Sequence, residues 1–184
     1  MRAFLAFRIP QEIKVYLQTV IGMMARRTDG VKWVNENGQH ITLKFFGEIE
    51  DERALLFQEA LSGLDERYGP FPVMLGEVGG FPTRRRARVI MVTLKKGIDN
   101  IRMIFNDIEE KLSELGVERE GREFTPHITL GRRKVPAPLL EKDVAVLDKK
   151  TFVLDTLALY RSTLTKEGAI YDPVWEIRPG GNKT

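Results

Sequence analysis

The chain has 184 residues, 42% of them hydrophobic and 30% charged, so it is long enough and apolar enough to form one folded domain with a packed core. It contains no cysteine, which excludes disulfides, thiolate nucleophiles and zinc–sulfur sites and fits a reducing, cytoplasmic compartment. The net charge of +3 favours an anionic partner, and no stretch approaches the roughly 20 apolar residues that span a membrane.

The first quarter of the chain predicts a strand, a helix and two extended segments. Residues 3–8 have the short, alternating pattern of a first strand. Pro10 is well placed to open a helix, and apolar residues then recur at helical spacing as far as Met24. Residues 31–34 and 41–46 are expected to be extended.

The next segments predict a helix, a strand and a loop. The helix is expected over residues 51–66, with Leu55, Leu56, Ala60, Leu61 and Leu64 facing inward. Residues 71–78 predict a strand, and Gly79-Gly80-Phe81-Pro82 predicts a loop. A basic cluster, Arg84–Arg88, follows it; such clusters are often only solvated surface.

The same order of elements then returns. Residues 88–94 predict a strand, and a helix follows with its apolar face made by Ile98, Ile101, Phe105, Ile108, Leu112 and Leu115. Gly116 is a helix stop signal, and residues 124–130 are again extended. The order of strand, helix and extended segment therefore occurs twice, over residues 3–46 and 88–130.

The last third of the chain predicts strands around a short helix. Pro136 and Pro138 are expected to break the extended run, with a short helix over residues 139–146. Strands are expected over residues 152–159 and 169–177 as a hairpin, followed by a loose tail at 179–184. Together the elements predict a mixed α/β architecture of two similar halves within one two-lobed domain that spans residues 1–184.

The chain has two histidines, and both begin the same tetrapeptide. His-Ile-Thr-Leu occurs at residues 40–43 and 127–130, which are separated by 87 positions (127 − 40) and lie at the same stage of the repeated order. At ordinary residue frequencies a matching tripeptide after the second histidine has a chance of roughly one in several thousand. Packing alone does not explain this coincidence.

Strand geometry places the polar residues of each tetrapeptide together. On a strand, His40, Thr42 and Lys44 share one face, and the intervening apolar residues share the other. By the same rule His127 and Thr129 share a face. If a pseudo-two-fold axis relates the halves, two pairs of imidazole and hydroxyl face each other across a cleft.

Such a pair of imidazoles suits the hydrolysis of a cyclic phosphodiester. Imidazole titrates near neutrality, so one copy can take a proton from water while the other protonates the departing ribose oxygen. Each role increases the rate by roughly a hundred- to ten-thousand-fold. The threonine hydroxyls can donate hydrogen bonds to the non-bridging phosphate oxygens.

Three other interpretations stay open. A single histidine on a strand is often a structural hydrogen-bonding residue. A zinc site needs three or four ligands at close spacing, and no carboxylate accompanies either tetrapeptide, so we expect no metal. An RNA-binding module without turnover would use the basic clusters Arg84–Arg88 and Arg132–Lys134 and would lose affinity steeply with salt.

The two tetrapeptides resemble the 2H phosphoesterase superfamily, and within it the bacterial and archaeal RNA 2′,3′-cyclic phosphodiesterases, also called 2′-5′ RNA ligases. The resemblance covers nearly the whole chain. It includes Met1–Ala6, Val31–Val34, His40–Gly47, Phe81-Pro82, Phe124–Leu130, Tyr160–Ser162 and Tyr171. It implies a bilobal α+β fold, with two pseudo-symmetric halves of mainly antiparallel sheet flanked by helices, around a water-filled cleft without metal or other cofactor.

The resemblance also implies an activity. Members of this family hydrolyse 2′,3′-cyclic phosphates at RNA ends and leave a 2′-phosphate, and some catalyse the reverse joining to a 5′-hydroxyl. The expected partners are therefore RNA ends, with no membrane, and we expect a monomer. Two aromatic residues, Phe81 and Tyr171, either stack on a base or serve packing.

Site roles follow from the same resemblance. His40 would be the general acid and His127 the general base, with Thr42 and Thr129 binding phosphate. This order of roles is borrowed, because a symmetric pair does not reveal which histidine is the acid. Arg132 is a further phosphate ligand in this comparison, but strict alternation would point it away from the cleft, so its contact requires a β-bulge near Gly131.

Overall fold

The strands form two antiparallel sheets. The computed structural model describes residues 1–166 and 168–178. The first sheet has the order β3 (His40–Glu48), β1 (Arg2–Arg8), β8 (Leu157–Leu164) and β9 (Ala169–Ile177). The second has the order β2 (Val31–Trp33), β6 (His127–Ala137), β5 (Ala87–Lys96), β4 (Phe71–Phe81) and β7 (Thr151–Leu154). The expected α+β fold of two similar halves is confirmed.

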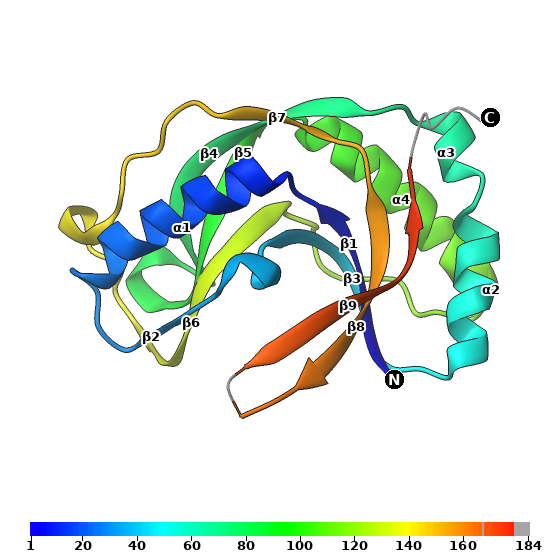
Figure 1. Ribbon diagram of the computed structural model, residues 1–184, viewed down its shortest axis with the longest axis horizontal. Helices are drawn as coiled ribbons and strands as arrows, with labels where there is room; N and C mark the ends of the chain where they lie inside the picture. Colours follow the sequence, from blue (N-terminus) through cyan, green and yellow to red (C-terminus); the bar gives the residue numbers. More distant parts are fainter. Residues whose placement is uncertain (167, 179–184) are drawn as a thin grey trace.

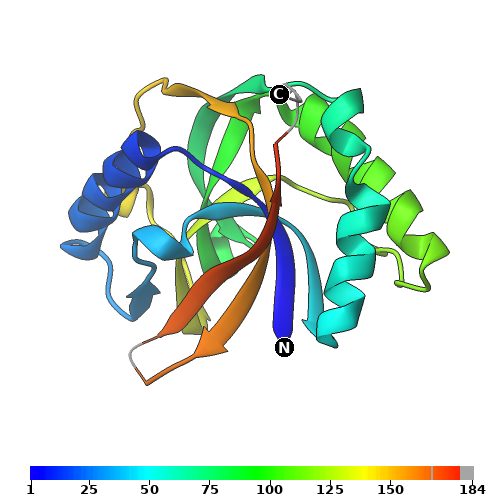
Figure 2. The ribbon, with the colours of Figure 1, turned by 45° about the vertical axis from the view of Figure 1, so that its right-hand side comes forward.

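The helices cover the sheets in a crossed arrangement (Figures 1 and 2). Helix α1 (Gln11–Ala25) follows β1 of the first sheet but lies over the second, where the Tyr16 hydroxyl accepts a hydrogen bond from the Asp148 amide at 2.7 Å. Helix α4 (Ile98–Glu114) follows β5 of the second sheet but lies beside α2 (Asp51–Leu61) against the first. Trp175 of β9 donates to the Ala54 carbonyl of α2 at 2.9 Å. Each half therefore depends on the other for part of its core.

The apolar patterns of α1 and α4 position them largely as expected. The buried side of α1 consists of Ile13, Leu17, Val20, Ile21 and Met24. Gly116 ends α4 with a φ of +75°, and its amide donates to the Ser113 carbonyl while Val117 donates to Leu112. This is a Schellman motif, so the predicted stop signal is confirmed. Leu115, expected to face inward, is instead exposed beside that turn.

The expected long helix at residues 51–66 is interrupted. It divides at Ser62 and Gly63 into α2 and the short α3 (Leu64–Arg67). Leu61 and Leu64 are buried as predicted, but Leu55 and Leu56 are exposed. The buried face runs instead through Ala54 and Phe57, which keep the helical spacing to Leu61.

Three other local predictions were wrong at the sheet margins. Residues 79–81 continue β4, because they pair with β5 through Gly80 and Ile90. The run 152–159 is two strands, since the chain passes between sheets at residues 155–156. Residues 139–146 contain only one 3₁₀ turn, Glu141–Asp143.

The closing segments also modify the prediction. Strand β6 begins only at His127 and continues to Ala137, so Pro136 does not end it. Near Pro136 the pairing with β5 is irregular, with a register shift between Ala87 and Val89 of β5. The missing amide of the proline is tolerated at such an irregularity. The hairpin of β8 and β9 is confirmed. The predicted loose tail, 179–184, lies outside the described residues. No helix in the described part of the chain has the length and apolar character needed to cross a bilayer.

Candidate active site

Both tetrapeptides begin a strand, and a β-bulge follows each at the same position. In β3, pairing with β1 passes from Thr42 to Lys44 and leaves Leu43 unmatched. In β6, pairing with β5 passes from Thr129 to Gly131 and leaves Leu130 unmatched. The first six residues of the two strands consequently share one burial pattern, in which the histidine and threonine are half-buried and the sixth residue is exposed.

The bulge in β6 brings Arg132 to the face that carries the histidine. Thr129 lies opposite Met91 and Arg132 lies opposite Val89, two positions apart on the regular strand β5. Arg132 therefore shares its face with Thr129 and His127. The β-bulge near Gly131, which a cleft-facing Arg132 requires, is therefore present.

The bulge in β3 overturns one expectation. Lys44 does not share the face of His40 and Thr42, because the extra residue turns its side chain into the core. Its ammonium lies 2.5 Å from the Glu109 carboxylate and donates to the Glu118 carbonyl at 2.7 Å. Phe45, which is 63% exposed, occupies the cleft face in its place.

An aromatic cluster surrounds His40. Its ring centroid lies 4.8 Å from that of Phe4, 5.4 Å from that of Tyr171 in an edge-on contact and 6.1 Å from that of Tyr160. Burial among these rings is the main cause that lowers the pKa of His40 to about 3, and the positive charges of Lys14 and Arg132 and the interaction with His127 contribute to the same shift in that order. In the free protein His40 is therefore neutral at physiological pH.

His127 is among the groups that lower the pKa of His40, so the two imidazoles interact electrostatically. Strands β3 and β6, which carry them, also approach each other across the gap between the two sheets. Their environments differ, because the Nδ1 atom of His127 lies 2.8 Å from the Thr125 carbonyl oxygen. A carbonyl only accepts, so Nδ1 carries the hydrogen and neutral His127 has its lone pair at Nε2.

The two predicted threonines have free hydroxyls among the described residues. Within the described chain, neither the Thr42 nor the Thr129 hydroxyl has a protein hydrogen-bond partner, so both are available to a ligand. A cavity of about 360 Å³ lies between the two sheets and is lined by two of the rings that contact His40, those of Phe4 and Tyr171. Its lining includes Phe4, Phe45, Ser162 and Tyr171 from the first sheet and Arg132 from the second.

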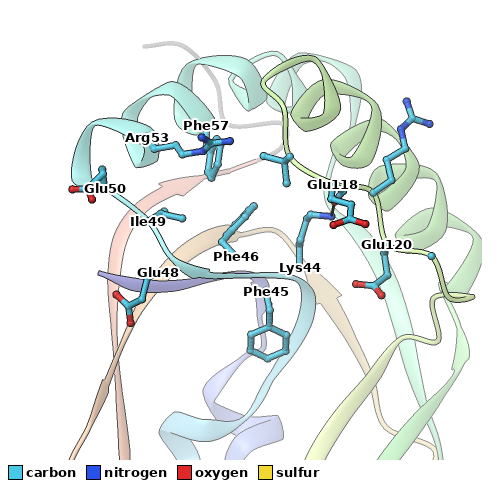
Figure 3. A pocket seen from close by; sticks show the side chains of 13 residues that line it. Lys44, Phe45, Phe46, Glu48, Ile49, Glu50, Arg53, Phe57, Glu118 and Glu120 are labelled. Carbon is cyan, nitrogen blue, oxygen red and sulfur yellow. Dashed lines mark hydrogen bonds between the residues drawn. The ribbon is translucent and has the colours of Figure 1, made fainter.

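A different cavity, of about 670 Å³, lies at the far end of β3 (Figure 3). Phe46 and Phe57 form its apolar side, with ring centroids 4.7 Å apart. Its charged lining consists of the paired Lys44, two arginines and four glutamates: Arg53, Arg119, Glu48, Glu50, Glu118 and Glu120. That excess of carboxylates makes it a poor site for a phosphate. Among the described residues no cluster of three or more His, Cys, Asp or Glu side chains suits a metal ion.

Two residues near His40 were not found from the sequence. Lys14 acts from α1, where one lysine on a helix gives no motif signal. Tyr160 appeared only as part of the family resemblance. Of the other candidates, Arg84 pairs with Glu141 at 3.2 Å rather than facing the cleft, and Phe81 lies half-exposed at the end of β4.

The low pKa of His40 gives a testable result. We expect NMR titration to show no protonation of the His40 ring between pH 8 and 5 in the free protein. Inorganic phosphate should raise this pKa, because a bound anion offsets the cations of Lys14 and Arg132. An unchanged pKa of His40 with saturating phosphate would place the anion elsewhere.

The same pKa predicts how stability depends on pH. In the unfolded chain His40 binds its proton near pH 6.5, and in the folded protein only near pH 3. The contribution of His40 to the free energy of unfolding should therefore fall as pH decreases through that window.

Comparison with known proteins assigns the family. The family described as the 2′-5′ RNA ligase superfamily matches residues 13–165, which include both tetrapeptides and Arg132. The chain belongs to this superfamily. The resemblance noted in the sequence is therefore confirmed.

Curated relatives of this superfamily member match it over most of its length. A Methanocaldococcus jannaschii protein named RNA 2′,3′-cyclic phosphodiesterase is 36% identical, over 96% of this chain and 99% of the relative. An Aeropyrum pernix protein of the same name is 30% identical, over 86% of this chain and 96% of the relative. Among solved structures, a Thermus thermophilus protein superposes with a TM-score of 0.82 at 28% identity, covering 98% of this chain and 99% of that one. Escherichia coli LigT complexed with 3′-AMP shares the fold, with a TM-score of 0.78 at 20% identity, covering 96% and 97% of the two chains.

Proposed function

We propose that this enzyme hydrolyses 2′,3′-cyclic phosphodiester ends of RNA to a 2′-phosphate, by acid–base catalysis with His40 and His127 and without a metal. The observation that carries the proposal is that two His-x-Thr strands, bulged at the same position, approach each other between the two sheets, with Arg132 on the face of His127. The names of the full-length relatives support the same substrate.

The order of roles is the one that the family resemblance implies, and the free Nε2 lone pair of His127 fits its role as the base. Nε2 of His127 accepts a proton from water, whose oxygen attacks phosphorus while the bond from phosphorus to the 3′ oxygen breaks. His40 gives its proton to that 3′ oxygen, so a 2′-phosphate and a free 3′-hydroxyl result. The Thr42 and Thr129 hydroxyls and the Arg132 guanidinium stabilise the charge on the non-bridging oxygens.

His40 needs the substrate in order to act as the acid. Its imidazole is neutral in the free protein, because Lys14, Arg132 and His127 oppose a further positive charge. The negative charge of a bound phosphodiester offsets these groups and raises the pKa of His40. Protonation is thereby coupled to occupation of the cleft.

A product assay tests the proposed reaction. A dinucleotide with a 2′,3′-cyclic phosphate should yield only the 2′-phosphate, in the presence of EDTA as in its absence. Digestion with a 3′-specific phosphatase, which should release nothing, identifies the product. A 3′-phosphate product, or activity that EDTA abolishes and a divalent metal restores, would contradict the mechanism.

Arg132→Ala should lower kcat/KM by about 10- to 100-fold, because a charge-assisted contact to phosphate contributes roughly 1.5–3 kcal/mol. Arg132→Lys should recover only part of the loss, since the ammonium lacks the planar fork of the guanidinium. Arg102→Ala, on the exposed side of α4, is the matched control and should behave like the wild type. Equal kcat/KM values for the alanine variants of Arg132 and Arg102 would show that Arg132 does not contact the phosphate.

Ligation is the second candidate activity, and the superfamily description favours testing it. RNA with a 2′,3′-cyclic end is incubated with RNA that has a 5′-hydroxyl, and a 2′-5′-joined product is sought. We further propose a cytoplasmic monomer, because one chain supplies both tetrapeptides and the sequence has no cysteine. Light scattering and cell fractionation test these two statements.

A further inference from the structure

Two cations lie directly opposite each other next to the proposed catalytic cleft. Lys32 on the edge strand β2 is paired with Arg132 on β6, so both side chains leave the same face of the sheet. Both are exposed. Like charges at directly opposed positions destabilise a sheet, and among the described residues neither cation has a carboxylate partner. An anion bound between them would relieve this repulsion.

A pocket lies beside Lys32 and continues the cleft. Its volume is about 390 Å³, within the range of small-ligand pockets and large enough for a nucleoside. It shares Arg132, Leu164 and Tyr171 with the cavity next to His40, and the Tyr171 ring contacts His40 itself. Lys32 and Asn35 add polar groups, and its described lining contains no carboxylate. The glutamate-rich cavity in Figure 3 lacks this character.

The chemistry of the substrate determines which anion comes next. A 2′,3′-cyclic phosphate occupies both ribose hydroxyls, so the RNA strand continues only through the 5′ oxygen. The nearest further anion is therefore the phosphodiester on the 5′ side of the terminal nucleoside.

We propose that Lys32 binds this preceding phosphodiester and that the pocket beside it holds the preceding nucleoside. This inference rests on the proposed function and deepens it, because Lys32 then selects an RNA strand over a mononucleotide. Lys32 takes no part in bond breaking. Arg132 lies between the two phosphates and contributes to both.

The test compares two substrates and two lysine variants. The substrates are adenosine 2′,3′-cyclic phosphate and the ApA dinucleotide with the same cyclic end. The variants are Lys32→Ala and the control Lys95→Ala, which removes an equal charge from the exposed end of β5. In the wild type, kcat/KM should be about tenfold higher for the dinucleotide, as expected for one charge-assisted contact.

Lys32→Ala should remove most of this preference and leave the mononucleotide rate unchanged, whereas Lys95→Ala should retain the preference. The slope of log KM for the dinucleotide against log salt should fall by about 0.7, the value for one phosphate contact on a single strand. The melting temperature should stay equal or rise, because the variant removes a like-charge pair.

Several outcomes would overturn the inference. Equal losses on both substrates would make Lys32 part of the catalytic phosphate site, and no loss on either would leave it without a role in binding. A wild-type enzyme that hydrolyses both substrates equally well would also refute it while sparing the proposed function. A wild type that cleaves neither would refute the proposed function, and the inference would fall with it.

Discussion

His40→Ala and His127→Ala are each expected to lower kcat for a 2′,3′-cyclic dinucleotide by about 10²- to 10⁴-fold, the usual contribution of one general acid or base. Each variant removes one proton-transfer group and leaves the strands in place, since the two side chains are only half-buried. Steady-state hydrolysis, followed by separation of the 2′-phosphate product, measures the effect. The double variant should lose less than the product of the two single losses, because acid and base act in one step.

The histidine variants need a control for folding. Far-UV circular dichroism and urea unfolding should match the wild type for His127→Ala, while His40→Ala opens space among Phe4, Tyr160 and Tyr171. His40→Asn, which fills more of that space, should be equally inactive. Added imidazole should restore part of the activity of the alanine variants. Near-normal turnover in either variant would end the two-histidine mechanism.

Lys44→Ala is expected to lower the free energy of unfolding by about 3–5 kcal/mol, as for other buried ion pairs that lose one partner. The Lys44 and Glu109 side chains are only 5% and 7% exposed. Without the ammonium, the one hydrogen-bond donor that the described residues leave to the Glu109 carboxylate is the Glu120 amide, at 2.6 Å. Urea unfolding at neutral pH, followed by circular dichroism, measures the change.

Two companion variants make that result specific. Lys44→Met combined with Glu109→Leu should recover most of the stability, because it removes both buried charges together. Arg102→Ala breaks an exposed ion pair with Glu123, 3.5 Å long, and should change stability by less than about 1 kcal/mol. A loss below about 1 kcal/mol for Lys44→Ala would contradict this prediction, because it would mean that water solvates the Glu109 carboxylate in place of the ammonium.

Periodicity predicted the elements that have one clear apolar face. Helices α1 and α4 follow their patterns because each covers a single core surface, whereas strand β1 is buried on both faces. The passage between sheets at residues 155–156 was missed, since both strands that flank it are extended and apolar. The inward face of α2 was also predicted wrongly, because Ala54 and Phe57 are buried in the core while Leu55 and Leu56 are exposed.

The site was predictable where the chain repeats itself and unpredictable where geometry departs from regular alternation. The duplicated tetrapeptide singled out His40 and His127 as candidate site residues, and their catalytic roles stay a prediction. A bulge moves every later residue of its strand to the opposite face. Strict alternation therefore assigned Lys44 to the wrong side of β3. It also left the direction of the Arg132 side chain undecided, because alternation does not predict the bulge in β6. Lys14 reaches the site from a helix and carries no comparable signal.

A doubled scaffold by itself would accept a substrate in either of two opposite orientations. The matching bulges prevent this, because they bring different residues to equivalent positions: the aromatic Phe45 on one wall of the cleft and the cationic Arg132 on the other. An RNA end has the same inequality, with an apolar base on one side and a charged backbone on the other. In the proposed mechanism this unmatched pair, together with the aromatic rings around His40, gives the substrate one orientation and the two identical motifs different tasks.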